Sequence, residues 1–477
     1  MGELERIREF LGCEPLRMVE NPEGLSPEEL FQLFLPDIVP ESERRLLTGF
    51  FRYKYRGETV PGEDEDRFSD LVRADAVMGE ELLPSIVSKL RQLSKYMKFS
   101  GEVLTSEQFR QTLQDMVYDY RVRLDSRDLK ILNMMRENVL TSIKSIADRL
   151  GWSYTTTHRR VKRLEERCRL GVFPRLNYSR IGLTHLLVLT EGEAHVESPY
   201  LLSRHELLGG DMYNLFSIVV PPRAVNKVCN DFERKLPRVW TWIVEGFEGV
   251  ITFDFYDVDR EDWSIDWNSW SLFLSHVLSK GWDKVIPPEG AGEPSPLPET
   301  PSGGEDITKR DLEFIDVLLH RFDVTTKDLS LMLGYGERTT ARDRRSLIER
   351  GIIQPCLSID HIGLNENILL IVESDAETLN SFAVAIRRLP KAWIYRMRTL
   401  DGESALACWL EAPPGSITPL ERAVRRTLRP LARYKIFFRS NQEGSGAPLI
   451  ELYDLQSRAW KWSPKMLKII PKRGKEE

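Results

Sequence analysis

The chain has 477 residues, 41% of them hydrophobic and 29% charged, with a formal net charge of −6. This composition is typical of a globular protein, the length suits about three domains, and no apolar run reaches the roughly 18 residues that span a bilayer. Because the N-terminal MGELERIREF is charged where a secretion signal is apolar, we expect a cytoplasmic protein with no membrane segment. The five cysteines are scattered and form no CxxC pair, which indicates neither disulfides nor a metal or cofactor site.

Residues 1–123 are acidic, with 17 Lys and Arg against 24 Asp and Glu. Helical periodicity over 26–35, 79–98 and 106–124 predicts a helical N-terminal domain, with a loop at 62–66. The alternation of aromatic and basic residues in FRYKYR, 51–56, favours a half-buried strand, and stacking on single-stranded nucleic acid is the alternative. An acidic helical domain of this kind would dock another protein or form an oligomer interface.

Residues 124–183 reverse the charge, with 13 Lys and Arg against 6 Asp and Glu, so this segment can attract phosphate. Its pattern predicts a helix from about Asp125, a short helix ending at Gly151, and a basic helix capped by Ser153 and running to Arg167. Two helices, a glycine turn and a basic helix form a helix-turn-helix. The segment 171–183 has the length of a small β-hairpin, or wing.

The basic helix opens with three threonines, which are poor helix formers, and carries five basic residues. Thr157, Val161 and Leu164 recur at helical spacing and would face inward, which turns Thr155 and Arg159 outward. Hydroxyl and guanidinium groups on one face suit contact with phosphates and base edges. A solvated charged surface is the alternative for any isolated basic helix.

The sequence repeats itself. A shift of 183 positions aligns Leu150-Gly151 with Leu333-Gly334 and Glu166-Arg167 with Glu349-Arg350, and later FYDVDREDW, 255–263, matches LYDLQSRAW, 452–460. We therefore predict an internal duplication. The Pro- and Gly-rich segment 286–306 is predicted to be the linker between the copies.

The second helix-turn-helix, 307–364, departs from the first. It holds nine Lys and Arg against nine Asp and Glu, and Arg344 stands where Val161 faces inward, a costly position for an unpaired guanidinium. Arg338, Thr339, Arg342 and Arg345 can still present a basic face. DNA contact and docking of a protein partner both stay open for this helix.

The rest of each copy has strand and helix patterns. Residues 365–463 read as strand, helix, strand, strand, helix, strand, and 184–285 read alike except that the first helix is shortened or lost at AHVESPY. The order βαββαβ is ferredoxin-like. Residues 464–477 form a basic tail. The fold class is therefore α+β: a helical N-terminal domain, then two tandem units of winged helix-turn-helix and ferredoxin-like domain.

The run LDSRDLKIL, the later LGWSYTTTHRRVKRLEE and the Ile181-Gly182-Leu183 triplet together resemble the Lrp/AsnC family of transcriptional regulators. The resemblance implies a sequence-specific regulator of double-stranded DNA whose recognition helix, 153–167, lies in the major groove, and whose duplication gives a covalent pseudo-dimer. The DNA-binding residues it implies are Ser153, Tyr154, Thr155, Thr156, His158, Arg159, Lys162, Arg163 and Arg175, with Arg338, Thr339, Arg342 and Arg345 in the second copy. It also implies an effector domain, with small-molecule contacts at the turns Gly209-Gly210-Asp211 and Asp401-Gly402.

Two other function classes stay open. One is an adaptor that contacts RNA polymerase or a basal transcription factor. The other is tetrapyrrole decarboxylation, which some relatives of the same plan perform, and for which His205 beside Arg204 is the candidate, with Met397 at the matching position. No nucleophile–base pair, phosphate-binding glycine loop or metal-ligand spacing is found, so we expect no enzyme. A monomer and a homodimer are both compatible with the sequence.

Overall fold

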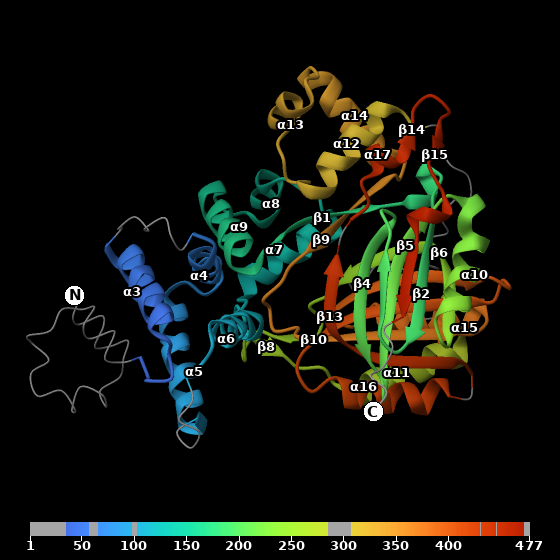
Figure 1. Ribbon diagram of the computed structural model, residues 1–477. Helices are drawn as coiled ribbons and strands as arrows, with labels where there is room; N and C mark the ends of the chain where they lie inside the picture. Colours follow the sequence, from blue (N-terminus) through green and yellow to red (C-terminus); the bar gives the residue numbers. More distant parts are fainter. Residues whose placement is uncertain are drawn as a thin grey trace, which may run out of the picture. The chain divides into compact units, whose positions relative to one another are not determined.

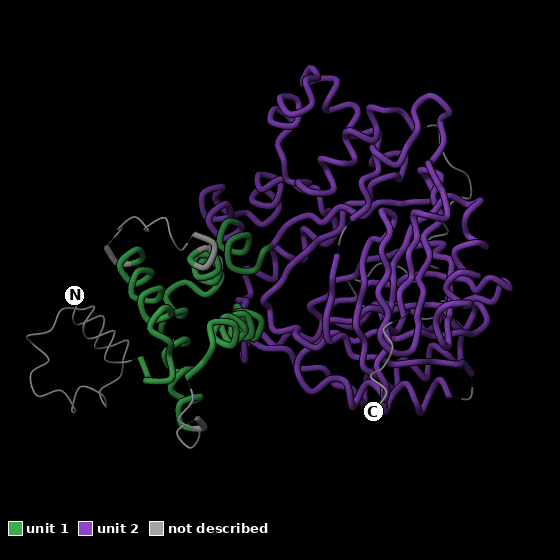
Figure 2. Tube along the Cα trace, in the orientation of Figure 1, with its two compact units in different colours: residues 1–122, 162–169 green, residues 123–161, 170–477 purple. Residues whose placement is uncertain are grey.

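The computed structural model describes residues 35–56, 65–97, 103–284, 307–429, 431–444 and 446–471. The chain divides into two compact units (Figure 2): unit 1 comprises Met1–Val122 and Lys162–Arg169, and unit 2 comprises Arg123–Val161 and Leu170–Glu477. The division passes through one helix, α9 (Tyr154–Cys168). None of the described helices is long and apolar enough to cross a bilayer. The predicted linker, 286–306, lies outside the described residues.

Unit 1 is helical and has its own hydrophobic core. Its helices are α3 (Glu41–Arg56), α4 (Glu65–Met78), the short η3 (Gly79–Glu81), α5 (Leu82–Met97) and α6 (Ser106–Asp119). The helices predicted over 79–98 and 106–124 are therefore confirmed, and α6 begins with a capping box between Thr105 and Gln108. The helix predicted over 26–35 and most of the loop predicted over 62–66 lie outside the described residues.

The strand predicted for FRYKYR is wrong, because residues 51–56 are the end of α3. Leu46, Leu47, Phe50 and Phe51 are all buried, and their spacing of one helical turn outweighs the alternation in the last six residues. Residues two apart on a helix point to different sides, so the geometry that the stacking hypothesis needs is also missing.

Unit 2 contains two sets of three helices, the second starting 183 residues after the first at every helix. The first set is α7 (Ser126–Glu137), α8 (Ile143–Leu150) and the start of α9; the second is α12 (Lys309–His320), α13 (Thr326–Leu333) and α14 (Glu337–Glu349). Both short helices end at a glycine with left-handed backbone, Gly151 (φ 67°) and Gly334 (φ 72°). The predicted order of two helices, a glycine turn and a third helix is confirmed in both.

Eight strands of unit 2 form one closed barrel in the order β10-β12-β11-β6-β2-β5-β4-β13 (Figure 1). They are β2 (Thr184–Glu191), β4 (Leu201–Leu208), β5 (Met212–Val220), β6 (Val239–Ile251), β10 (Glu366–Glu373), β11 (Lys391–Thr399), β12 (Ser404–Ala412) and β13 (Arg433–Gly444). The sequence predicted two separate sheets, and the structure corrects this. Unit 2 has two halves, whose barrel strands lie within residues 184–285 and 365–463 respectively. Because β6 pairs with β11 and β4 pairs with β13, the strands of both halves share one sheet without free edges.

The barrel has a packed interior and helices outside. All eight strands contribute to one interior cluster, for example through Leu187, Trp242 and Met397. Outside, α10 (Val225–Lys235) packs on one side, and α15 (Ala376–Ile386), α16 (Ile417–Leu428) and α11 (Trp267–Lys280) pack on another. Helix α11 was not predicted; its buried Trp270 donates an Nε1 hydrogen bond to the Ala385 carbonyl at 2.9 Å.

Short elements tie the halves together. The wing hairpin predicted over 171–183 is not formed, because β1 (Gly171–Leu176) pairs with β9 (Ile353–Ser358) and is followed by η4 (Tyr178–Ile181). At AHVESPY, β3 (Ala194–Glu197) pairs with β16 (Lys468–Pro471), so part of the predicted basic tail is a strand with buried Ile469. The remaining elements are η5 (Pro222–Ala224), β7 (Tyr256–Asp257), β8 (Asp262–Trp263), η6 (Trp282–Lys284), α17 (Leu449–Leu452), β14 (Tyr453–Asp454), β15 (Ala459–Trp460) and η7 (Pro464–Met466).

Candidate nucleic-acid interface

The three threonines at the start of α9 have three different environments. The Ser153 hydroxyl accepts a hydrogen bond from the Thr156 backbone N–H at 3.1 Å and donates to the Thr156 hydroxyl at 2.8 Å, which makes it the helix cap. Thr157 is buried and donates its hydroxyl to the Ser153 carbonyl at 3.1 Å. Thr155 is exposed. Of the three threonines, only Thr155 is thus exposed.

The inward face predicted for α9 is confirmed, since Thr157, Val161 and Leu164 are 0%, 2% and 0% exposed. On the opposite face, Ser153, Tyr154, Thr155, Arg159 and Lys162 are exposed, whereas Thr156, His158 and Arg163 are half-buried. Arg159 makes no ion pair with any described residue, while Lys162 lies 3.5 Å from Glu165. His158 lies against Tyr154, with ring centres 5.8 Å apart.

Arg160 fixes the start of α9 to the start of α7. Its guanidinium donates to Asp125 at 2.9 Å and to the fully buried Asp128 at 2.8 Å. Burial lowers the pKa of Arg160, but the two carboxylates raise it more, and the net shift is upward. This arginine is therefore occupied within the protein, and sequence reasoning did not single it out.

The C-terminal turns of α9 belong to unit 1. There, Arg167 donates to the Tyr120 hydroxyl at 2.6 Å, with its guanidinium carbon 6.0 Å from the Tyr120 ring centre. One helix therefore carries the exposed basic face at its start and a contact to the N-terminal helices at its end.

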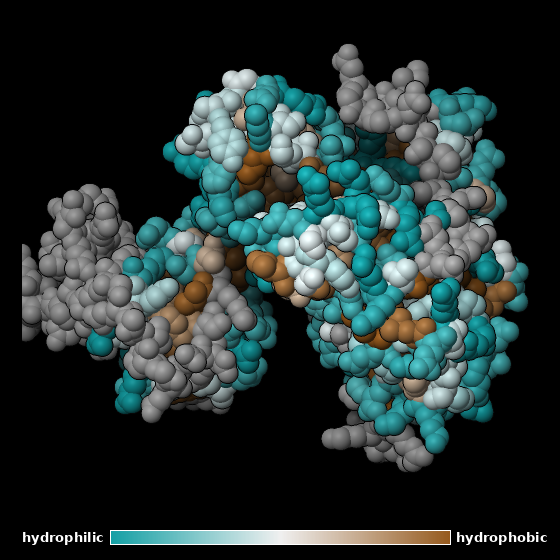
Figure 3. Space-filling model, turned by 90° about the horizontal axis from the view of Figure 1, so that it is seen from above, coloured by the Kyte–Doolittle hydropathy of each residue, from teal (hydrophilic) through white to brown (hydrophobic). Residues whose placement is uncertain are grey.

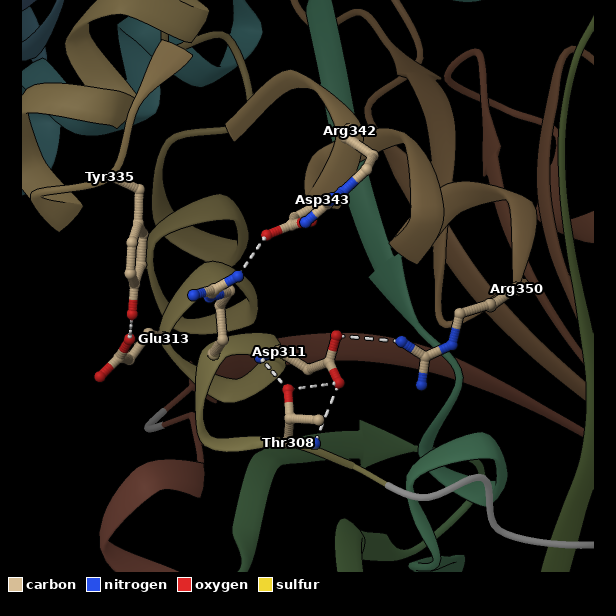
Figure 4. Close-up of polar contacts among 8 residues, drawn as sticks. Thr308, Asp311, Glu313, Tyr335, Arg342, Asp343 and Arg350 are labelled. Atoms are coloured by element: carbon tan, nitrogen blue, oxygen red, sulfur yellow. Dashed lines mark hydrogen bonds and ion pairs between the residues drawn. The ribbon is translucent and has the colours of Figure 1, made fainter. Parts of the chain in front are cut away.

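Helix α14 presents its arginines differently (Figure 4). Asp343, at the position matching Arg160, accepts from Arg342 at 3.0 Å and from Arg310 at 3.4 Å. Asp311, which matches Asp128, instead pairs with Arg350 at 3.0 Å. Of the predicted face, Arg338, Arg342 and Arg345 are exposed and Thr339 is half-buried. One of these three arginines thus already has a carboxylate partner.

Arg344, which the sequence placed at a costly inward position of the second set of helices, has hydrogen-bond acceptors. Arg344 is half-buried and donates to the backbone carbonyls of Val324 at 2.8 Å and Phe322 at 2.5 Å. Its guanidinium carbon lies 4.9 Å from the Phe322 ring centre. Backbone acceptors and an aromatic face thus replace the apolar contacts that Val161 makes in the first set.

Arg175 lies elsewhere than on a wing. Since β1 pairs with β9, its half-buried side chain reaches the Tyr395 hydroxyl and the Phe247 ring, within unit 2. The expectation that it contacts the DNA backbone finds no support in this position.

The predicted effector turns are exposed, and the predicted decarboxylase residues His205 and Arg204 have different surroundings. The turns at Gly209-Gly210-Asp211 and Asp401-Gly402 are exposed, and a Cβ atom on Gly209 would approach Phe437 Cδ1 to 2.6 Å. His205 and Arg204 are neighbours on β4, but His205 is buried against Trp409 while Arg204 donates to Asn214 at 2.8 Å and Glu206 at 2.8 Å. Successive strand residues face opposite sides, so this pair does not share one pocket.

Comparisons with known proteins identify one part of the chain. Residues 124–167 match a family model described as winged helix-turn-helix DNA-binding. A search of curated proteins gives no match. Two crystal structures of the siroheme decarboxylase NirDL, one in co-complex with an iron-uroporphyrin III analogue, are similar to this chain at 14% identity and TM-score 0.34, with 66% of this chain and 90% of that chain covered. The family match, together with α7, α8 and α9, shows that residues 124–167 are a winged helix-turn-helix DNA-binding domain.

Proposed function

We propose that this protein is a sequence-specific regulator of transcription that binds double-stranded DNA with α9 in the major groove. The observation that carries the proposal is the division of α9 into a buried face and an exposed face with Tyr154, Thr155, Arg159 and Lys162. Arg159 can donate two hydrogen bonds to a guanine, and Thr155 can reach a phosphate or a thymine methyl group. The family match over 124–167 supports the same reading.

We further infer that the two halves of unit 2 are copies of one unit, each with a ferredoxin-like domain, joined as a covalent pseudo-dimer. Reciprocal contacts support this inference. Trp263 donates its Nε1 hydrogen to the Ile362 carbonyl at 2.5 Å, and Trp460 donates to the Ile181 carbonyl at 2.7 Å. Each tryptophan thus contacts the Ile-Gly-Leu triplet of the other half. A contact made once in each direction is what a two-fold relation between like units produces.

The test is selection of bound fragments from the host genome at about 0.15 M salt with nonspecific competitor DNA. We expect enrichment of one motif, with two unequal half-sites about one helical turn, or ~34 Å, apart if both third helices read DNA. A variant with Thr155, Arg159 and Lys162 all changed to Ala should lose the enrichment while keeping its thermal unfolding transition. Absence of any enriched motif with the wild-type protein would sink the proposal.

A second candidate function is an adaptor for the transcription machinery, and one observation favours it. On α13, Leu331 and Met332 are 72% and 50% exposed, where the first set has Asp148 and Arg149. Figure 3, viewed from above, shows a mostly hydrophilic surface interrupted by apolar patches. Exposed apolar side chains on a short helix suit contact with a protein such as RNA polymerase or a basal transcription factor.

The adaptor candidate is tested with purified RNA polymerase. Wild-type protein should be retained on immobilised polymerase, and a variant with Leu331→Asp and Met332→Arg, the residues of the first set, should not. The same variant should keep its affinity for the selected DNA. If polymerase does not retain the wild-type protein, this candidate fails and leaves the DNA-binding proposal unaffected.

A further inference from the structure

One end of the barrel interior holds a cavity. It has a volume of about 540 Å³ and is lined by residues of β1 and of most barrel strands, among them Arg175, His205, Trp393 and Trp409. A smaller cavity of about 290 Å³ shares Arg175 and Tyr395 with it. Binding sites for small molecules have volumes of about 300–1,000 Å³ and are often found in the mouths of β-barrels.

Arg175 brings a positive charge into this cavity. Its guanidinium carbon lies 4.3 Å from the Phe247 ring centre and 4.9 Å from that of Tyr395, and it donates to the Tyr395 hydroxyl. No carboxylate of a described residue lies within ion-pair distance of it. Since arginine does not lose its proton in proteins, the charge stays half-buried without a counter-ion from the described residues.

Two titratable groups near Arg175, His185 and Cys356, are neutral. Burial, and secondly the charge of Arg175, lowers the pKa of His185 to about 3. Burial raises the pKa of the Cys356 thiol to about 11, although Arg175 opposes the shift. Neutral surroundings and a fixed cation together form a place for an anionic group.

The other charged groups of the cavity already have partners. Lys391 lies 2.7 Å from Glu411 and 3.2 Å from Asp360, and Arg439 donates to the Asn367 side-chain oxygen at 2.5 Å. Arg439 also donates to the Gln442 side-chain oxygen at 2.7 Å, whereas the Arg175 guanidinium donates to the Tyr395 hydroxyl alone among the described residues. Arg175 therefore keeps more donor groups for an added anion.

Aromatic side chains and one histidine form the walls. Trp393 and Trp409 line the cavity, and the ring of His205 lies 4.7 Å from that of Trp409. His205 is 8% exposed, its Nε2 bonds the Ser203 hydroxyl at 3.0 Å, and its Nδ1 is buried with no hydrogen-bond partner among the described residues. Burial, and secondly the charge of Arg439, lowers its pKa to about 3, so the ring is neutral. A buried polar atom of this kind without a partner calls for one from a ligand.

We propose that this cavity binds a planar aromatic carboxylate, with the ring against the wall formed by Trp393, Trp409 and His205 and the carboxylate on Arg175. The exposed turns at 209–211 and 401–402 do not line this cavity, so the proposed site differs from the effector position implied by family resemblance. The binding itself is independent of DNA.

The position of the site couples it to both helix-turn-helices. Strand β1 begins three residues after α9 ends and supplies Arg175, and Ser358, the last residue of β9, also lines the cavity. A ligand there touches the segments that leave α9 and α14. We treat the ligand as an effector and not as a substrate. The inference that this effector regulates transcription rests on the proposed function.

To test the proposal, 2-naphthoate is titrated into the full chain in the absence of DNA. Binding is measured by the quenching of tryptophan fluorescence and by calorimetry. We expect saturable binding, weakened about 10- to 100-fold by Arg175→Met and unchanged by Arg426→Met, an exposed arginine of α16. His205→Phe keeps a ring against Trp409 but removes the polar nitrogen, and should weaken binding about 3- to 10-fold. The neutral 2-naphthamide should bind more weakly than the acid.

Three results would overturn the proposal: no saturable binding by folded wild-type protein, equal affinity for the acid and the amide, or equal affinity in Arg175→Met. If Arg175→Met loses its unfolding transition, the acid–amide difference and His205→Phe decide. Because no DNA is present, a negative result here is distinct from failure of the DNA-binding proposal. With binding established, an unchanged DNA affinity in saturating 2-naphthoate would exclude the effector role.

Discussion

In the first helix-turn-helix Arg160 occupies the position that Asp343 occupies in the second. Arg160 bonds the two aspartates at the start of α7 and leaves Arg159 without a carboxylate partner among the described residues. Asp343 instead holds Arg342 and Arg310. Two sets of helices with the same spacing thus differ in the charge at this position: the third helix of the second set carries an aspartate that neutralises one of its exposed arginines, Arg342, whereas Arg159 in the first set has no such neighbour.

The largest expected effect concerns the stability of the two sets. Asp128→Ala removes the carboxylate, 0% exposed, that pairs with Arg160. The Arg160 side chain, which is 19% exposed, then loses one of its two acidic partners. We expect a loss of about 2–4 kcal/mol, near the range for breaking a buried ion pair. Asp311→Ala, in a pair whose side chains are 14% and 27% exposed, should cost about 1 kcal/mol. Hydrogen exchange of the amides in α7 and α12 measures both effects in the full chain.

The matched control for this pair is the exposed ion pair of Arg149 and Glu137, whose side chains are 54% and 57% exposed. Arg149→Ala should change protection by less than about 0.5 kcal/mol. Equal losses for Asp128→Ala and Asp311→Ala would contradict the difference in burial.

The next effect concerns DNA affinity. Arg159→Ala should weaken binding to the best selected site by about 1–3 kcal/mol and relax the preference at one base pair. Arg342→Ala should cost less than about 0.5 kcal/mol, because Asp343 already neutralises that side chain. Fluorescence anisotropy with the selected duplex and single-base variants measures both. Comparable losses would show that α14 reads DNA as closely as α9 does.

A gain of affinity would sharpen the comparison further. Asp343→Asn keeps the shape of the side chain but removes the charge that holds Arg342 and Arg310. If α14 lies near phosphate, we expect tighter binding by about 0.5–1 kcal/mol and a steeper dependence on salt. The control is Asp316→Asn, at a half-buried residue of α12. It changes the net charge by the same amount and should leave the salt dependence unchanged.

Local patterns in the sequence were sufficient for the helices of the two helix-turn-helices and for most barrel strands, but not for α3, α4 and α11. The inward triad Thr157, Val161 and Leu164 followed from spacing, and Arg344 was identified as needing partners, which are the carbonyls of Phe322 and Val324. Periodicity reports which face of an element is apolar but not which distant strand covers its edge.

The features that sequence analysis missed are the non-local ones. Pairing of β1 with β9 joins Arg175 to Gln354, far along the chain, and moves that arginine from a presumed wing into the barrel mouth. Barrel closure through β6 and β11 is of the same kind. The exchange of Arg160 for Asp343 was visible in the alignment of the copies, but its effect depended on which carboxylates α7 and α12 bring near.

The smallest expected effect concerns pH. Burial raises the pKa of Asp125, but the backbone N–H of Asp128 and the side chain of Arg160 lower it more, so that it lies below the ordinary 3.8. Thr308, at the matching position of the second set, does not titrate. A carboxylate whose pKa is lower in the folded state stabilises the protein above its unfolded pKa, and this contribution is lost as pH falls through the folded pKa.

Asp125→Thr, which keeps a capping hydroxyl, should therefore lower the stability of the first set at pH 7. The effect should be slight, since the Asp125 side chain is 43% exposed and screened by solvent. The difference from wild type in thermal unfolding should shrink as pH falls below about 3.8. If it stays constant down to pH about 2, the carboxylate charge is not what distinguishes the two sets at this position.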